Sequence, residues 1–120
     1  ARLQNACGLH ICPSLAEGWG HYIAEGAACR ALVMTTDGPP MNELISESRG
    51  CLIRSDCVGE RHLGRMFRPQ AGALEESMEK VLAMSEGERR SLGQAARSWF
   101  EENDRAFSER LRAAIGRFDD

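Results

Sequence analysis

Three short apolar runs constrain the fold of this chain most, because a helical segment separates the first two. The runs are residues 9–14 (LHICPS), 31–36 (ALVMTT) and 50–55 (GCLIRS), and the helical segment is residues 21–30. Strands that are apolar throughout and alternate with helices are typical of a parallel sheet that is covered on both faces. The sequence therefore predicts an α/β fold, with a short parallel sheet flanked by helices.

Helical patterns surround these runs and fill the second half of the chain. Residues 3–7 should end a helix that Gly8 closes, and residues 41–46 should form a helical turn. Three helices should follow residue 70, and a capping box at residues 85–88 (SEGE) should open the second. Their apolar stripes are Leu74, Met78, Val81 and Leu82, then Leu92, Ala96, Trp99 and Phe100, then Phe107, Leu111, Ala114, Ile115 and Phe118. Residues 56–70 lack a clear period, so we interpret them as a loop or insertion.

The composition argues against several classes of partner. The net charge is −3 and Lys80 is the only lysine among fifteen cationic residues, which argues against nucleic acid. No apolar run approaches the length of a membrane span. Five irregularly spaced cysteines without a CxxC pair are typical of buried thiols in a reducing compartment, so we expect a cytoplasmic protein. His10, Cys12 and His21 raise the alternative of a metal site, but they lack the paired spacing of metal ligands.

Residues 13–28 (PSLAEGWGHYIAEGAA) give the strongest indication of function. A strand ends near Pro13, a Gly-rich turn follows, and a helix starts near His21. Ligands of open α/β sheets bind beyond the carboxyl ends of strands, and the first amides of a helix suit a diphosphate. Glu25 has two acceptor oxygens for a ribose diol, and Glu17 could meet hydroxyls of an attached sugar. Glutamates also occur near helix starts for structural reasons, so the pattern alone leaves both interpretations open.

A longer segment, residues 11–45, resembles a known family. It resembles the C-terminal, donor-binding domain of retaining glycosyltransferases with the GT-B fold, in the large family-four group. Members share an apolar strand ending in Pro-Ser, a Glu-Gly-aromatic-Gly turn, a helix carrying a second Glu, another apolar strand, and a Gly-containing turn leading to Glu. The matching residues are Pro13, Ser14, Glu17, Gly18, Trp19, Gly20, Glu25, Ala27, Ala28, Asp37, Gly38 and Glu43.

The resemblance implies a fold and a set of roles. Residues 1–70 would be the C-terminal half of a Rossmann-like nucleotide-sugar-binding domain, and residues 71–120 would be the helical tail of the same domain. Glu17 would contact the transferred sugar as the catalytic residue, and Glu25 would bind the ribose of the donor. Amides around the turn would hold the diphosphate or the sugar, and the residues concerned are Gly18, Trp19, Gly20 and His21.

The implied reaction transfers a sugar from a nucleoside-diphosphate sugar to an acceptor with retention of configuration, without an essential metal or other cofactor. The acceptor would be a sugar, a lipid-linked sugar or a small molecule. Two alternatives stay open: a GT-B sugar-nucleotide epimerase, and a non-catalytic α/β interaction module. His21, Tyr22 and Arg30 depart from the residues that are common in the family.

The family's cationic donor residues and its acceptor domain would both precede residue 1. We therefore expect a fragment that is inactive by itself. The first strand of such a fragment would present an open sheet edge, which favours a homodimer through that edge. The full-length protein could lie against a membrane.

Overall fold

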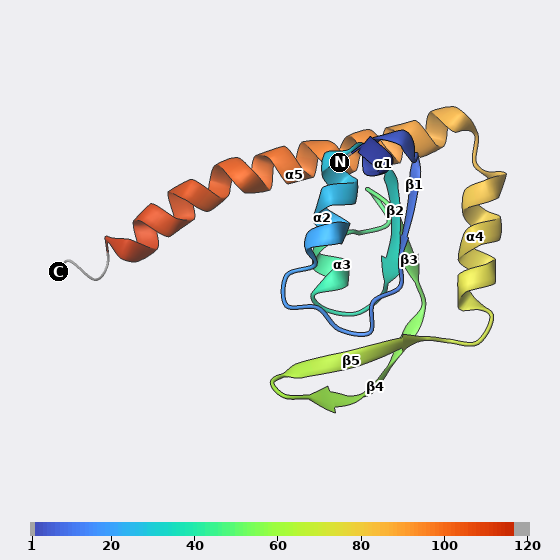
Figure 1. Cartoon of the computed structure of the whole chain (residues 1–120), viewed down its shortest axis with the longest axis horizontal. Coiled ribbons are helices and arrows are strands. Elements are labelled where there is room, and N and C mark those ends of the chain that lie inside the picture. Colours follow the sequence, from blue (N-terminus) through green and yellow to red (C-terminus); the bar gives the residue numbers. More distant parts are fainter. Residues whose placement is uncertain (1, 117–120) are drawn as a thin grey trace.

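The computed structural model describes residues 2–116 and has a three-stranded parallel sheet at its centre (Figure 1). The strands β1 (Leu9–Cys12), β2 (Leu32–Thr36) and β3 (Cys51–Ile53) lie in the order β1-β2-β3. Every residue of β2 is buried. A strand that is covered on both faces favours a continuous apolar run over an alternation of apolar and polar residues. The sequence prediction of an α/β fold with a short parallel sheet is thus confirmed.

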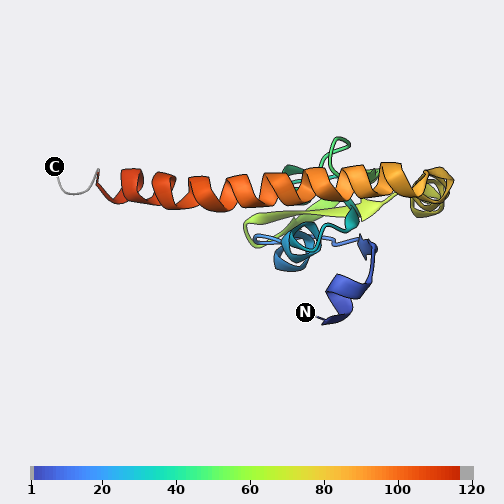
Figure 2. The same cartoon turned by 90° about the horizontal axis from the view of Figure 1, so that it is seen from above.

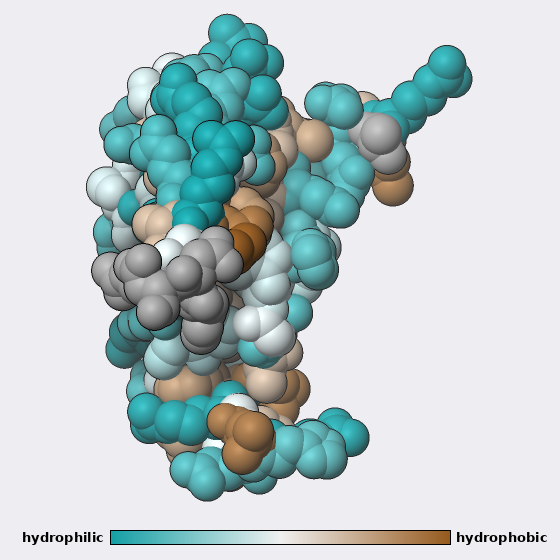
Figure 3. Space-filling view, turned by 90° about the vertical axis from the view of Figure 1, so that its left-hand side faces the viewer, coloured by the Kyte–Doolittle hydropathy of each residue, from teal (hydrophilic) through white to brown (hydrophobic). Residues whose placement is uncertain are grey.

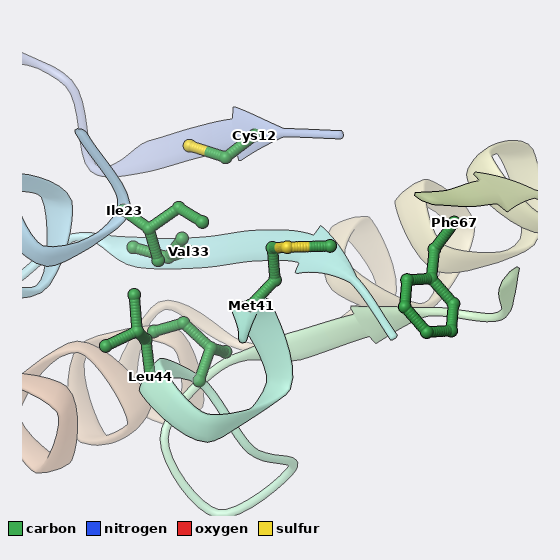
Figure 4. Packing of buried hydrophobic residues seen from close by; sticks show 7 residues of the cluster. Cys12, Ile23, Val33, Met41, Leu44 and Phe67 are labelled. Atoms are coloured by element: carbon green, nitrogen blue, oxygen red, sulfur yellow. The ribbon is translucent and has the colours of Figure 1, made fainter. Parts of the chain in front are cut away.

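Helices cover both faces of this sheet. On one face lie α2 (His21–Ala28) and α3 (Met41–Leu44), and on the other lies α4 (Ala73–Ala83) (Figure 1). Alternate residues of β2 point to opposite sides, so Val33 joins the α2 and α3 cluster while Met34 joins the α4 cluster. Figure 4 shows the first cluster, whose buried members are Cys12, Ile23, Val33, Met41, Leu44, Ile45 and Phe67. Full burial of each large side chain contributes about 1.5–3 kcal/mol to stability.

The prediction of a loop at residues 56–70 is wrong, because these residues form an antiparallel hairpin. Its strands are β4 (Ser55–Arg61) and β5 (Gly64–Pro69), and the turn between them holds His62 at a φ of 55°. The hairpin is mostly exposed, so few apolar residues mark it in the sequence. Phe67 alone is buried within it, against Gly38, where an added Cβ would lie 2.3 Å from the Phe67 ring. In Figure 3 the hairpin forms the lowest part of the molecule.

The prediction of two separate helices after residue 85 is also wrong, because one helix, α5 (Glu86–Ile115), spans 30 residues. No Gly or Pro interrupts the chain between Phe100 and Phe107, so nothing ends the helix there. The predicted capping box is confirmed: the Ser85 hydroxyl accepts a hydrogen bond from the Glu88 N–H, and the Glu88 carboxylate accepts one from the Ser85 N–H. Phe118 lies outside the described residues.

The first half of α5 packs on the body, and the second half extends beyond it (Figure 2). Gly93 makes the closest approach, since an added Cβ would lie 2.1 Å from the backbone oxygen of Arg30. Arg97 donates a hydrogen bond of 2.6 Å from Nη1 to the backbone oxygen of Ala28. Within residues 2–116, the helices lack an apolar stretch of the length that a bilayer crossing requires.

The predicted apolar stripe of α4 is only partly correct. Leu74 and Leu82 are 36% and 66% exposed, whereas Ala73, Ser77 and Val81 are buried. The helix therefore turns small side chains toward the sheet, which allows it to lie close to β3. Before the sheet, α1 (Arg2–Ala6) confirms the predicted helical end that precedes Gly8.

Candidate functional site

The Gly-rich turn lies at the carboxyl end of β1, where the sequence places it. Gly20 has a φ of 88° and is the N-cap of α2, so the turn ends in a left-handed conformation that favours glycine. A Cβ at Gly20 would also lie 2.8 Å from Leu44 Cδ1. At Gly18, by contrast, an added Cβ would meet no atom within 4 Å. One glycine is thus required by packing, and the other leaves open space beside the backbone.

Buried hydroxyl groups of the central strand fix the start of this turn. Thr35 Oγ1 donates a hydrogen bond of 2.9 Å to the backbone oxygen of Cys12. Thr36 Oγ1 donates one of 2.7 Å to the backbone oxygen of Ser14. Both threonines are fully buried; the bond to Cys12 is buried and the bond to Ser14 is partly buried, and together they hold the turn against β2. From the hairpin, the Phe67 N–H donates a further bond of 2.7 Å to the backbone oxygen of Leu15.

Glu17 is half-buried and belongs to a chain of hydrogen bonds. The Ser14 hydroxyl donates to Glu17 Oε1 over 2.6 Å, and the Tyr22 hydroxyl is hydrogen-bonded in turn to Ser14 Oγ. Burial is the largest cause that raises the pKa of the Tyr22 hydroxyl, which therefore keeps its proton and can donate to Ser14. This network orients one oxygen of Glu17 and leaves its second carboxylate oxygen for a ligand.

Glu25 is exposed on α2, on the same helical face as Tyr22, which lies three residues earlier. Gln4 on α1 donates a hydrogen bond of 2.6 Å from Nε2 to Glu25 Oε2. A hollow of about 300 Å³ beside β1 is lined by both Gln4 and Tyr22. The two glutamates thus have separate hydrogen-bond partners, and one residue from each network borders the same open space.

The first amides of α2 lie at the start of the helix, directly after the Gly-rich turn. Because Gly20 has no side chain, no side-chain hydrogen bond caps the helix. The Gly20 backbone oxygen accepts from the N–H groups of Ile23 and Ala24. The N–H groups of His21 and Tyr22 precede these two and point out of the helix start, where the helix dipole adds partial positive charge. Such a helix start favours an anion.

Trp19 points away from the two glutamate networks. Its side chain is 47% exposed and lines a different hollow, together with residues of α5. The sequence interpretation missed Gln4, the hydroxyl role of Ser14, and Tyr22. Of these, Tyr22 had a detectable signal, because its spacing from Glu25 places both on one helix face.

Of the residues considered for a metal site, His10 and Cys12 pack in the body, and His21 is exposed at the start of α2. His10 Nε2 lies 3.0 Å from the backbone oxygen of Gln4, and the His10 ring packs against Gly26 of α2. Cys12 is buried, and burial together with the nearby Glu17 carboxylate raises the pKa of its thiol to about 11. Within residues 2–116, no three His, Cys, Asp or Glu side chains gather closely enough to hold a metal ion.

Comparisons with known proteins add no relative. No protein-family model matches this chain, and a search of curated proteins also finds no match.

Proposed function

We propose that this chain is the donor-binding portion of a retaining glycosyltransferase, which transfers a sugar from a nucleoside-diphosphate sugar to an acceptor. One observation supports this proposal most. The turn that carries Glu17 leads into the helix that carries Glu25 at the carboxyl end of a parallel sheet. Neither glutamate lines the hollow beside β1, but Gln4 and Tyr22, which belong to their hydrogen-bond networks, do. Nucleotides bind at this end of open α/β sheets. The Rossmann-like, GT-B assignment is part of the same proposal.

In this proposal Glu25 holds the ribose. A carboxylate can accept hydrogen bonds from both hydroxyls of a vicinal diol. Gln4 already donates to Oε2 of Glu25, which fixes the rotamer of an exposed side chain. One ribose hydroxyl would then share Oε2 with Gln4, and the other would donate its hydrogen bond to Oε1. The loss in side-chain entropy on binding is smaller for a carboxylate that is already oriented.

The diphosphate lies at the start of α2, and the transferred sugar lies near Glu17. The amides of His21 and Tyr22, with the open backbone at Gly18, donate to the phosphate oxygens. As the bond between the sugar and the diphosphate breaks, negative charge builds on the diphosphate. Fixed amide dipoles stabilise that charge more in the transition state than in the ground state. The Ser14 hydroxyl keeps the Glu17 carboxylate in place to contact the sugar.

The experiment that tests this function is a calorimetric titration of the full chain with UDP, GDP and ADP. We expect one of them to bind saturably, and we expect residues 1–120 to bind without turnover. Glu25→Gln should raise the dissociation constant about tenfold, which corresponds to one lost charge-assisted hydrogen bond. Glu79→Gln is the matched control, because Glu79 is exposed on α4, on the far face of the sheet. The proposal fails if none of the three nucleotides binds, or if both substitutions have the same effect.

One observation favours a second function, a non-catalytic α/β interaction module. Ile11 on β1 is 44% exposed, and β1 lies at an edge of the sheet with unpaired backbone groups. A second copy of the chain could pair with this edge to form a homodimer. Sedimentation of the chain with and without Ile11→Lys separates this alternative from the donor-binding proposal, which does not require self-association.

A further inference from the structure

A second hollow lies on the other side of the Gly-rich turn, under the projecting half of α5. It has a volume of about 350 Å³ and is open to solvent. Figure 1 shows α5 passing over this side of the body, beyond α2. The lining residues are Trp19, Phe100, Asn103, Asp104, Phe107 and Arg110. We call this hollow the α5 groove.

The walls of the α5 groove combine aromatic rings with a few polar groups. Trp19 is 47% exposed and Phe107 is 55% exposed, so both rings present large apolar surfaces to water. Asn103 and Arg110 lie at the same groove and are linked, since Arg110 Nη2 donates a hydrogen bond of 3.0 Å to Asn103 Oδ1. Aromatic walls with a small number of hydrogen-bonding groups are typical of ligand sites, and the volume lies at the lower end of their range.

The charges of the groove indicate the chemistry of its occupant. Asp104 contributes one negative charge and Arg110 one positive charge, so the groove has no net charge. Asp104 would repel a nucleotide or another phosphorylated ligand, and the groove has no surplus of positive charge to offset this repulsion. A neutral sugar fits better, because its C–H face stacks on aromatic rings while its hydroxyls bond to carboxylate, amide and guanidinium groups.

Both walls of the groove are held in place by the body. Gly93 and Arg97 fix α5 against the backbone of residues 28–30, so the helix carries Asn103, Asp104 and Phe107 at a defined position. The turn that carries Trp19 is held at its start by the hydroxyls of Thr35 and Thr36. It is held at its end by Gly20, which packs closely against Leu44. A groove between two fixed walls binds with a smaller ordering cost than a groove between mobile segments.

We propose that the α5 groove binds the ring of a neutral saccharide. Trp19 and Phe107 would stack on the pyranose ring, and a direct binding experiment tests this.

The test is ¹⁹F NMR of the full chain labelled with 5-fluorotryptophan, whose two tryptophans, Trp19 and Trp99, give two signals. The probes are methyl α-D-mannopyranoside, methyl α-D-glucopyranoside and maltose. We expect the Trp19 signal to shift saturably with at least one probe, with a dissociation constant of about 1 mM or weaker. The Trp99 signal should shift less than the Trp19 signal, because Trp99 does not line the α5 groove and the Arg49 guanidinium lies over its ring, 4.8 Å from the centroid. Sorbitol, a linear polyol, should shift neither signal.

Variants distinguish the groove from general surface effects. Phe107→Ala and Asp104→Asn should each weaken saccharide binding about tenfold or more. Leu111→Ala is the control, since Leu111 is 44% exposed on the same half of α5 and does not line the groove. The proposal is overturned if no probe shifts the Trp19 signal, if sorbitol shifts it equally, or if Phe107→Ala binds the probe as the original chain does.

The same variants separate this inference from the donor-binding proposal. Phe107→Ala should leave nucleoside-diphosphate binding unchanged, and Glu25→Gln should leave saccharide binding unchanged. Loss of nucleotide binding alone would refute the donor site, whereas loss of saccharide binding alone would refute the groove.

Discussion

The two halves of α5 have a similar spacing of apolar residues and different surroundings. In residues 86–100, Gly93 and Ala96 are buried against the body. In residues 101–115, Phe107, Leu111 and Ile115 are 55%, 44% and 56% exposed. Both halves space their apolar residues as an amphipathic helix does. The comparison teaches that such spacing identifies a helix and one of its faces, but it does not identify what that face contacts.

The largest effect should come from the closest contact of the packed half. Gly93→Ala places a Cβ where the backbone oxygen of Arg30 is 2.1 Å away, and this oxygen cannot move without shifting the α2–β2 connection. We expect the free energy of unfolding to fall by about 3 kcal/mol or more, as in severe overpacking. Urea unfolding followed by circular dichroism measures it.

Gly87→Ala is the matched control for this prediction. Its added Cβ would come no closer than 3.9 Å to a neighbour, the Ser85 hydroxyl oxygen. The gain in helix propensity should therefore stabilise the chain by up to about 1 kcal/mol. Equal effects at the two glycines would show that the first half of α5 is not packed as described.

Alkaline pH should lower the free energy of unfolding through Cys12, which is buried in the packed body and does not belong to the projecting half of α5. The pKa of Cys12 is raised to about 11 in the folded chain, so the unfolded chain loses this proton first as pH rises. The stability that the neutral thiol contributes is present below the unfolded pKa and is lost as pH rises to about 11. A shift of this size corresponds to about 2–3 kcal/mol. Urea unfolding measures the loss of unfolding free energy between neutral and alkaline pH, and this loss should be larger by that amount in the original chain than in Cys12→Ala.

A smaller effect should follow loss of the helix cap. Ser85→Ala removes the hydroxyl that accepts from the Glu88 N–H, which should cost about 1 kcal/mol. Ser108→Ala, at an exposed position of the projecting half, should be neutral within about 0.5 kcal/mol. If both substitutions cost the same, the cap does not stabilise the packed half.

The smallest effect on stability should come from the projecting half. Phe107→Ala should change the free energy of unfolding by about 0.5 kcal/mol or less, because the ring is 55% exposed. Amide hydrogen exchange should show low protection for residues 111–115, beyond the α5 groove, and high protection around Ala96, since tertiary contacts rather than propensity stabilise most helices. Uniform protection along α5 would contradict the difference between the halves.

The sequence predicted the elements whose burial is strong and uniform. β2 is buried throughout, and its apolar run identified both its position and the parallel sheet. The helix start at His21 and the capping box at Ser85 were predictable because each depends on local chemistry within a few residues. Only sequence patterns of short range were needed.

The hairpin and the buried face of α4 were not predictable in the same way. Residues 55–69 alternate weakly, and Phe67 is buried by Gly38, a residue far earlier in the chain. On α4 the buried positions include Ala73 and Ser77, which are less apolar than the exposed Leu82. The hydrogen bonds of Glu17 and Glu25 also depend on partners that only the folded chain brings near, and Gln4 is the clearest case.

The hydroxyl bonds of Thr35 and Thr36 have a consequence for redesign. Both hydroxyls donate to backbone oxygens, those of Cys12 and Ser14, and not to the side chains that follow. The stretch from Leu15 to Trp19 can therefore change its side chains while both of its ends keep their places, one at the central strand and the other at Gly20. A designer who wishes to alter the surface of this turn can randomise those positions without rebuilding the sheet.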